Sequence, residues 1–389
     1  MPRAAAPSST SAAARSATAR AEDAACAACW APACVFIGIW LACGVRWDVI
    51  ACLYGWSLLF VLLVHSRAPS ALCIATQSLI LGTPFLVNAQ TMRHEADVPA
   101  FRIVFSFCAL YVLARALQVI QHRSWYETCS RLTTFCTVDW FVLAAAHDTR
   151  AVCFEAQRVF DGSVLRTYLI SMAATAAAAT AAAAPLLQGV WWGVPQSIVL
   201  GLCAMSALFA LDAFFRGMWL AAGVRLRSTM NSPWRSTSVS EFWGKRWDRF
   251  VRDMLSDLVF KPLRQRGVAR EWAVLATFSA SAFLHAFPLL ATGGAGSAFQ
   301  AAGVVAYFWL QALAVAVESG WPNLVKRARS SRWGCQLWVL VVVVLPAQLL
   351  CAPYFTVSSW AAADGSTTWL PQALSAAVAA TSIWCCTAR

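Results

Sequence analysis

The sequence is poor in charged residues and in histidine. Charged residues make up 12% of its 389 residues, against about 25% in soluble proteins, whereas hydrophobic residues make up 60%. Together with a mean hydropathy of +0.60, this composition excludes a water-soluble enzyme. Because lipid offers the backbone no hydrogen-bond partner, such a chain crosses a membrane as helices. We therefore expect an all-α, polytopic integral membrane protein.

Sequence motifs for several kinds of chemistry are also missing. The chain contains no His/Cys cluster with metal-ligand spacing, no glycine-rich phosphate loop and no G-x-S-x-G nucleophile elbow. We therefore expect neither a metal site nor a bound cofactor.

Apolar windows of about 20 residues predict about 8 to 11 membrane spans. The windows lie near residues 26–45, 49–65, 71–90, 101–120, 134–147, 166–187, 194–223, 272–291, 301–318, 335–352 and 368–386. They divide the chain into a disordered N-terminus (1–25), N-terminal transmembrane helices (26–224), a basic amphipathic segment with a histidine-bearing helix (225–291) and C-terminal transmembrane helices (292–389).

The net charge of +12 is concentrated in two segments. Residues 225–270 contain 11 Lys and Arg against four acidic residues, and residues 323–333 contain four basic residues and no acid. Two predicted spans separate these segments, so both lie on one side of the membrane, which the positive-inside rule makes cytosolic. Topology and attraction to anionic lipid explain this charge, and a phosphorylated cytosolic substrate is the alternative. Nucleic acid is a poor explanation.

One of the five histidines, His285, lies well inside the strong apolar segment 272–291. An ionisable group at membrane depth is costly and usually faces a cavity or the bundle interior, so His285 is a candidate functional residue. Desolvation favours the neutral imidazole, which can accept a proton. Small neighbours such as Ala282 and Ala286 leave room for a substrate chain or a partner helix, and Pro288 predicts a kink or helix end. The alternative is a histidine that only hydrogen-bonds between helices.

A second unusual segment, residues 238–260, predicts a basic amphipathic helix lying along the membrane surface. Ser238 and Glu241 have the spacing of a capping box, and Pro262 is expected to stop the helix. Asp248 projects from the edge of the apolar face, where it can turn into the protein. The apolar face includes Trp243 and Trp247, and the far face carries Lys245, Arg249, Arg252 and Ser256.

Three stretches of the sequence carry a family resemblance. They are NSPWRSTSVSEFWGKRWD at 231–248, VFKP at 259–262 and LATFSASAFLH at 275–285. A Phe-Trp-Gly-basic-Arg-Trp motif followed about forty residues later by an embedded histidine is a fairly specific combination. Together these stretches resemble the wax synthase branch of the membrane-bound O-acyltransferase superfamily.

The resemblance implies transfer of an acyl group from acyl-CoA to a hydroxyl, with His285 as the general base in a membrane chamber. The second polar position of the family motif falls on Asp248, where family members usually have Asn or His. Ala286 stands where plant wax synthases often have Glu. An ionised Asp248 would orient the imidazole like a triad carboxylate, whereas a protonated one would donate a hydrogen bond.

Acyl-CoA is then a co-substrate, and its phosphates and apolar tail require a basic cytosolic mouth joined to an apolar tunnel. Other expected partners are membrane lipids and a fatty alcohol or another lipid alcohol. The expected location is the endoplasmic reticulum, with a plastid as the alternative because residues 1–20 have the composition of a transit peptide. The residues expected to bind substrate are Trp243, Lys245, Arg246, Trp247, Arg249 and Ser281.

Two other functions are compatible with the sequence. A polytopic transporter or channel would use His285 as a proton relay, and charged residues in several spans or paired broken helices would favour it. A catalytically inactive relative that acts as a binding protein would agree with Asp248 and Ala286. Incubating the purified protein with labelled acyl-CoA and a panel of alcohols separates these functions from an acyltransferase.

Overall fold

All regular secondary structure in the described part of the chain is helical. By length and composition, α14 (Arg270–Ala291) and α15 (Ser297–Gly320) can each cross a membrane. A third span is possible if the pair Trp333–Val344 and Ala347–Tyr354, bent by 42°, is counted as one. The computed structural model describes residues 69–82, 98–121, 228–293, 296–320 and 332–357, with isolated residues within 59–85 and 166–216.

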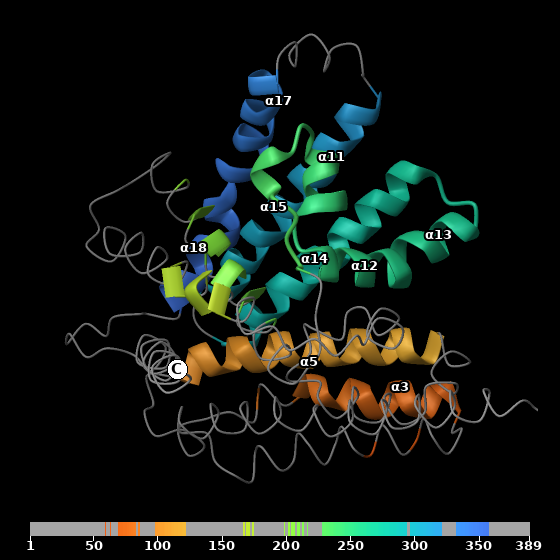
Figure 1. The fold of residues 1–389 in the computed structure, drawn as a ribbon. Helices are drawn as coiled ribbons and strands as arrows, with labels where there is room; N and C mark the ends of the chain where they lie inside the picture. Colours follow the sequence, from red (N-terminus) through yellow and green to blue (C-terminus); the bar gives the residue numbers. More distant parts are fainter. Residues whose placement is uncertain are drawn as a thin grey trace, which may run out of the picture.

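The helices agree with the apolar windows wherever the two can be compared. Beside α14 and α15, α3 (Ser70–Ser78) with η1 (Leu79–Gly82) and α5 (Val98–Gln121) fall in predicted windows. Figure 1 shows α3 and α5 side by side, and α5 also contacts α14. The segment 1–25 and the windows 26–45, 134–147 and 368–386 lie outside the described residues, and 49–65, 71–90, 166–187 and 194–223 are described only in part. The division into four parts stays a prediction.

α14 and α15 make an extensive helix contact in the centre of the described structure. Ala282 and Ala286, one turn apart on α14, are buried in a cluster with Val304 and Phe308 of α15. Small side chains let two helices approach closely, so these alanines accommodate a partner helix. α14 continues through Pro288 to Ala291, so the helix does not end just past His285, and the alternative of a kink at Pro288 stays a prediction.

The basic segment is not the single helix that its periodicity predicts. Trp247 is extended (ψ 137°) and Asp248 has a left-handed φ of 27°, which interrupts the helix. Pro262, expected to stop the helix, instead lies in the first turn of α13, where proline is tolerated. The segment consists of α11 (Val239–Glu241), the π-helix η6 (Phe242–Arg246), α12 (Arg249–Leu255), the π-helix η7 (Ser256–Phe260) and α13 (Lys261–Gln265).

The last described helices bend where a proline interrupts the backbone hydrogen bonds. α17 (Arg332–Val339) continues as the π-helix η8 (Leu340–Val344), and α18 (Ala347–Val357) begins just after Pro346. α18 packs on α15 and α14, and η8 packs on α15. These helices therefore close one side of the space between α14 and the basic segment.

Candidate active site

His285 is held by the backbone of its own helix. Its Nδ1 lies 2.8 Å from the carbonyl oxygen of Ser281, one turn earlier in α14. A carbonyl can only accept, so Nδ1 carries the proton and Nε2 of the neutral ring keeps a lone pair. The rings of Phe107 and Phe308 lie 5.8 and 4.9 Å from the imidazole, centroid to centroid. His285 therefore offers one proton-accepting nitrogen in an aromatic setting.

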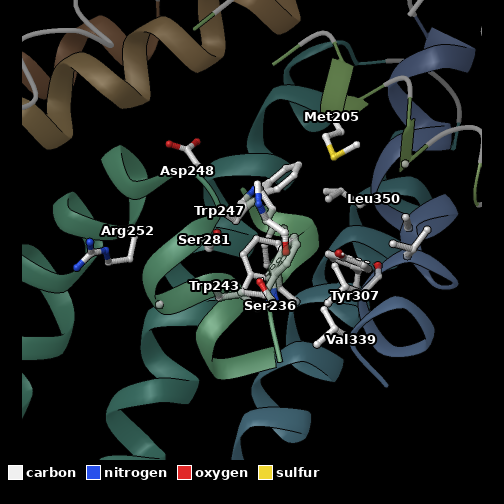
Figure 2. Close-up of a pocket in the computed structure, with 18 of the residues that line it drawn as sticks. Met205, Ser236, Trp243, Trp247, Asp248, Arg252, Ser281, Tyr307, Val339 and Leu350 are labelled. Carbon is white, nitrogen blue, oxygen red and sulfur yellow. Dashed lines mark hydrogen bonds between the residues drawn. The ribbon is translucent and has the colours of Figure 1, made fainter. Parts of the chain in front are cut away.

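A large cavity adjoins this histidine. Its volume is about 1050 Å³, and apolar side chains form most of its lining. Among the described residues, its charged lining consists of Asp248, Arg252 and Arg270. Figure 2 shows Asp248 and Arg252 on one side of the cavity and the apolar Val339 and Leu350 on the other. The cavity thus has a charged side and an apolar side.

Asp248 lines the same cavity as His285, but its carboxylate is hydrogen-bonded to the backbone of α12. Its carboxylate accepts a hydrogen bond of 3.2 Å from the backbone N–H of Val251 and so caps α12. Desolvation raises the pKa of Asp248 to about 6, and the nearby charge of Asp212 adds to this rise. No hydrogen bond joins Asp248 to His285 among the described contacts, and in Figure 2 the carboxylate points away from Ser281.

The predicted substrate-binding residues fall into two groups of three. Trp243, Trp247 and Ser281 line the cavity. Lys245, Arg246 and Arg249 do not belong to its lining: Lys245 is exposed, Arg246 forms an ion pair of 2.8 Å with Glu241, and Arg249 donates to the carbonyl of Ser228. A substrate contact by the second group stays a prediction.

The first turn of the basic segment is tied to α15 and α17. The carboxylate of Glu318 on α15 accepts from the backbone N–H groups of Val239 and Ser240 at 2.8 and 3.0 Å. It also accepts from the indole N–H of Trp338 on α17 at 2.9 Å. The capping box contributes as well, because the hydroxyl of Ser238 accepts from the N–H of Glu241 at 2.8 Å. Three elements therefore meet at one carboxylate.

A short neighbouring stretch holds the break in the basic segment. Asn231 N–H donates to the carbonyl of Arg246, and Arg249 N–H donates to the carbonyl of Thr229, both at 2.8 Å. Thr229 is fixed in turn by Asp212, whose carboxylate accepts from its N–H at 2.8 Å and from its hydroxyl at 2.9 Å. The interruption at Trp247 and Asp248 is thus a braced feature of the site.

Comparison with known proteins agrees with this geometry. Residues 226–310, which include the FWGKRW motif and His285, match the Membrane bound O-acyl transferase family. This segment is therefore similar to that family. The resemblance to the wax synthase branch is therefore confirmed, and the apolar spans agree with an integral membrane protein.

Three relatives show how far the similarity extends. A probable long-chain-alcohol O-fatty-acyltransferase 9 of Arabidopsis thaliana is 30% identical over 103 residues, 24% of this chain and 30% of the relative. The acyl-CoA–sterol O-acyltransferase 1 of the same plant is 26% identical over 179 residues, 42% and 49% of the two chains. The long-chain-alcohol O-fatty-acyltransferase of Simmondsia chinensis is 30% identical over 117 residues, 28% and 31% of the two. The chain therefore matches less than half the length of each relative.

Four polar residues in or just beyond the segment 226–310 were not identified as site residues from the sequence. Arg252 and Arg270 line the cavity, although Arg252 had been assigned to the far face of a continuous helix. Gln311 and Glu318 on α15 lie just beyond the family match and hold the basic segment. The reasoning that singled out His285, a polar residue in an apolar span, applies equally to Gln311.

Proposed function

We propose that this protein is an acyl-CoA-dependent O-acyltransferase that esterifies a lipid alcohol, with His285 as its general base. The observation that carries the proposal is the hydrogen bond from His285 Nδ1 to the Ser281 carbonyl, which leaves Nε2 as a proton acceptor beside the cavity. An alcohol is a poor nucleophile until a base within hydrogen-bond reach takes its proton. The family match of the same segment supports this reaction class.

The reaction is an acyl transfer whose proton passes through His285. Nε2 accepts the alcohol proton while the alcohol oxygen forms a bond to the thioester carbonyl carbon. The carbon–sulfur bond then breaks, and the CoA thiolate takes the proton from the imidazolium. The products are the ester and CoA, and His285 returns to its neutral form. No metal and no further cofactor takes part.

We place the phosphates of acyl-CoA at Arg252 and Arg270 on the charged side of the cavity. Arg270 lies 15 residues before His285 on α14, a separation of about 22 Å along the helix. The pantetheine arm of acyl-CoA likewise separates its phosphates from its thioester. Nη1 of Arg252 forms an ion pair of 2.8 Å with Asp253, and its Nε has no hydrogen-bond partner among the described residues, so the guanidinium keeps an unused donor for a phosphate oxygen. Trp243, Trp247 and Ser281 would contact the pantetheine arm or the acyl chain.

The acceptor that we propose is a long-chain alcohol or a sterol. Two of the relatives described above are named as long-chain-alcohol acyltransferases and one as a sterol acyltransferase. The apolar side of the cavity, with Val339 and Leu350, suits either class. We further propose that the whole chain has about 8 to 11 spans and resides in the endoplasmic reticulum, with a plastid as the alternative.

The test compares His285→Ala with Phe283→Leu in membranes that contain equal amounts of each protein. Phe283 lies on the same helix but its side chain is 52% exposed and outside the cavity lining. With labelled acyl-CoA, long-chain alcohols and sterols, we expect ester formation by the wild type and Phe283→Leu. Loss of the base should lower the rate by about a hundredfold or more.

The same assay tests the role of His285 and distinguishes an active enzyme from an inactive relative. Substantial activity of His285→Ala would remove the base from the mechanism. Acyl-CoA binding by the wild type without any ester product, across the full alcohol panel, would instead indicate an inactive relative that binds its ligand.

A further inference from the structure

Gln311 lies behind the cavity wall, and both ends of its side-chain amide form hydrogen bonds. It lies near the middle of α15 and is completely buried, with 0% of its surface exposed. Its amide oxygen accepts from the indole N–H of Trp243 at 3.1 Å, and its amide nitrogen donates to the carbonyl of Val342 at 2.9 Å. Because each end of the amide has a different partner, the orientation of the side chain is fixed.

The carbonyl that Gln311 contacts lies in η8, just before the bend at Pro346. In an α-helix the carbonyl of Val342 would accept from the N–H of residue 346, but Pro346 has no N–H. Gln311 therefore donates to a carbonyl that cannot form the α-helical bond, at the bend between η8 and α18. A buried carbonyl without a donor is costly, so the amide nitrogen of Gln311 is expected to stay on this carbonyl. The amide oxygen then points to Trp243.

Trp243 is separated from the candidate base by one aromatic ring. Its indole ring lies 6.1 Å from Phe308, whose ring in turn lies 4.9 Å from His285. Trp243 also lines the cavity, so its side-chain rotamer shapes the space beside the base. The hydrogen bond to Gln311 selects the rotamer that directs the indole N–H toward α15.

We propose that Gln311 is a positioning residue that fixes Trp243 in the cavity wall and thereby sets which acyl chains fit beside His285. This proposal rests on the acyltransferase function proposed above. Gln311 acts through Trp243, because it is not itself part of the cavity lining. A change at Gln311 releases the indole ring, and Trp243→Phe removes it, so both changes remove the same hydrogen bond.

The first measurement needs no activity. Thermal unfolding of the detergent-purified chain is compared for Gln311→Leu, Trp243→Phe and the double variant. A hydrogen bond between the two residues predicts that the double variant loses clearly less stability than the sum of the single losses. Additive losses would show that the two side chains are not coupled and would overturn the proposal.

The second measurement is the ratio of kcat/KM for palmitoyl-CoA to that for lauroyl-CoA. This ratio does not depend on the fraction of folded enzyme, so a merely structural defect leaves it unchanged. We expect each single variant to shift the ratio by about threefold or more, the effect of a hydrogen bond of ordinary strength. The double variant should shift it no further than the larger single change.

Trp309→Phe is the matched control. Its indole N–H also joins α15 to a polar side chain, donating to Ser279 of α14 at 3.1 Å, but Trp309 lies outside the cavity lining. We expect its ratio to equal that of the wild type. A ratio within twofold of wild type for Gln311→Leu, or an equal shift for Trp309→Phe, would overturn the proposal. Absence of any wild-type turnover would instead overturn the acyltransferase function, while the unfolding data still decide whether Gln311 and Trp243 are coupled.

Discussion

The two halves of the site are built in different ways. The base lies on α14, a regular helix of 22 residues, and its orienting bond comes from Ser281 in the preceding turn. The basic segment is broken into short pieces, and its position depends on Glu318, Gln311 and Asp212 from other parts of the chain. Local backbone geometry therefore suffices to present the base, whereas the cavity wall beside it requires tertiary contacts.

Among the changes that test this difference, Glu318→Leu should have the largest effect, a loss of stability in the basic segment. The change leaves three donors, from Val239, Ser240 and Trp338, without their acceptor. The expected loss is about 3 kcal/mol or more of unfolding free energy, because each orphaned donor costs about 1 kcal/mol or more. Glu318→Gln keeps an acceptor oxygen and should lose less. Denaturant unfolding in detergent measures both variants, and a loss well below about 1 kcal/mol for Glu318→Leu would show that the carboxylate does not hold the segment.

Next in size is the effect of removing Arg252 and Arg270 together. If these cations bind the phosphates of acyl-CoA, the double alanine variant should raise the KM for acyl-CoA by about tenfold or more, since charge-assisted hydrogen bonds contribute about 1.5 to 3 kcal/mol. The kcat and the KM for the alcohol should change much less. Steady-state kinetics with each substrate varied in turn measures this difference. An unchanged KM for acyl-CoA would place the phosphates elsewhere.

A smaller effect, on pH dependence, is expected from Asp248→Asn. The pKa of this carboxyl rises from 3.8 to about 6 on folding, so the folded protein binds the proton more tightly than the unfolded chain. Stability therefore falls as pH rises from 3.8 to 6, and the cost is fully present above pH 6. Asparagine removes the charge, keeps the cap to Val251 and tolerates a left-handed φ.

Asp248→Asn should therefore be more stable than the wild type at pH 7.5, by up to about 3 kcal/mol for this pKa rise, and nearly equally stable near pH 4. Unfolding curves at the two pH values measure this. Its activity should stay within a few fold of wild type, because the carboxylate binds the Val251 N–H and not His285. Complete loss of activity would show that the carboxylate acts on the imidazole after all.

The same contrast explains what could be predicted from the sequence. The windows 272–291 and 301–318 locate α14 and α15 to within a few residues, because a membrane span depends on local composition. His285 is found by the cost of placing an ionisable group in such a span. Both predictions concern features that a single helix determines on its own.

The basic segment could not be predicted in the same way. Its apolar periodicity is real, but periodicity does not show where a π-turn or a break inserts extra residues. The break at Asp248 is braced by Thr229 and Asn231, which only the folded chain brings into contact with it. The assumption of a continuous helix then placed Arg252 on the far face, whereas Arg252 lines the cavity.

Lys245→Ala is therefore the smallest and the most discriminating change. Lys245 lies in η6 between two cavity-lining residues, Trp243 and Trp247, yet its own side chain is exposed and outside the lining. A charge in solvent is screened over about 8 Å at physiological salt, so its removal should change the KM for acyl-CoA by less than about twofold. If Lys245→Ala raised that KM as much as the loss of Arg252 and Arg270, the phosphates would bind along the outer face of η6. The cavity mouth would then extend beyond the break, and the basic segment would bind substrate directly as well as form the wall.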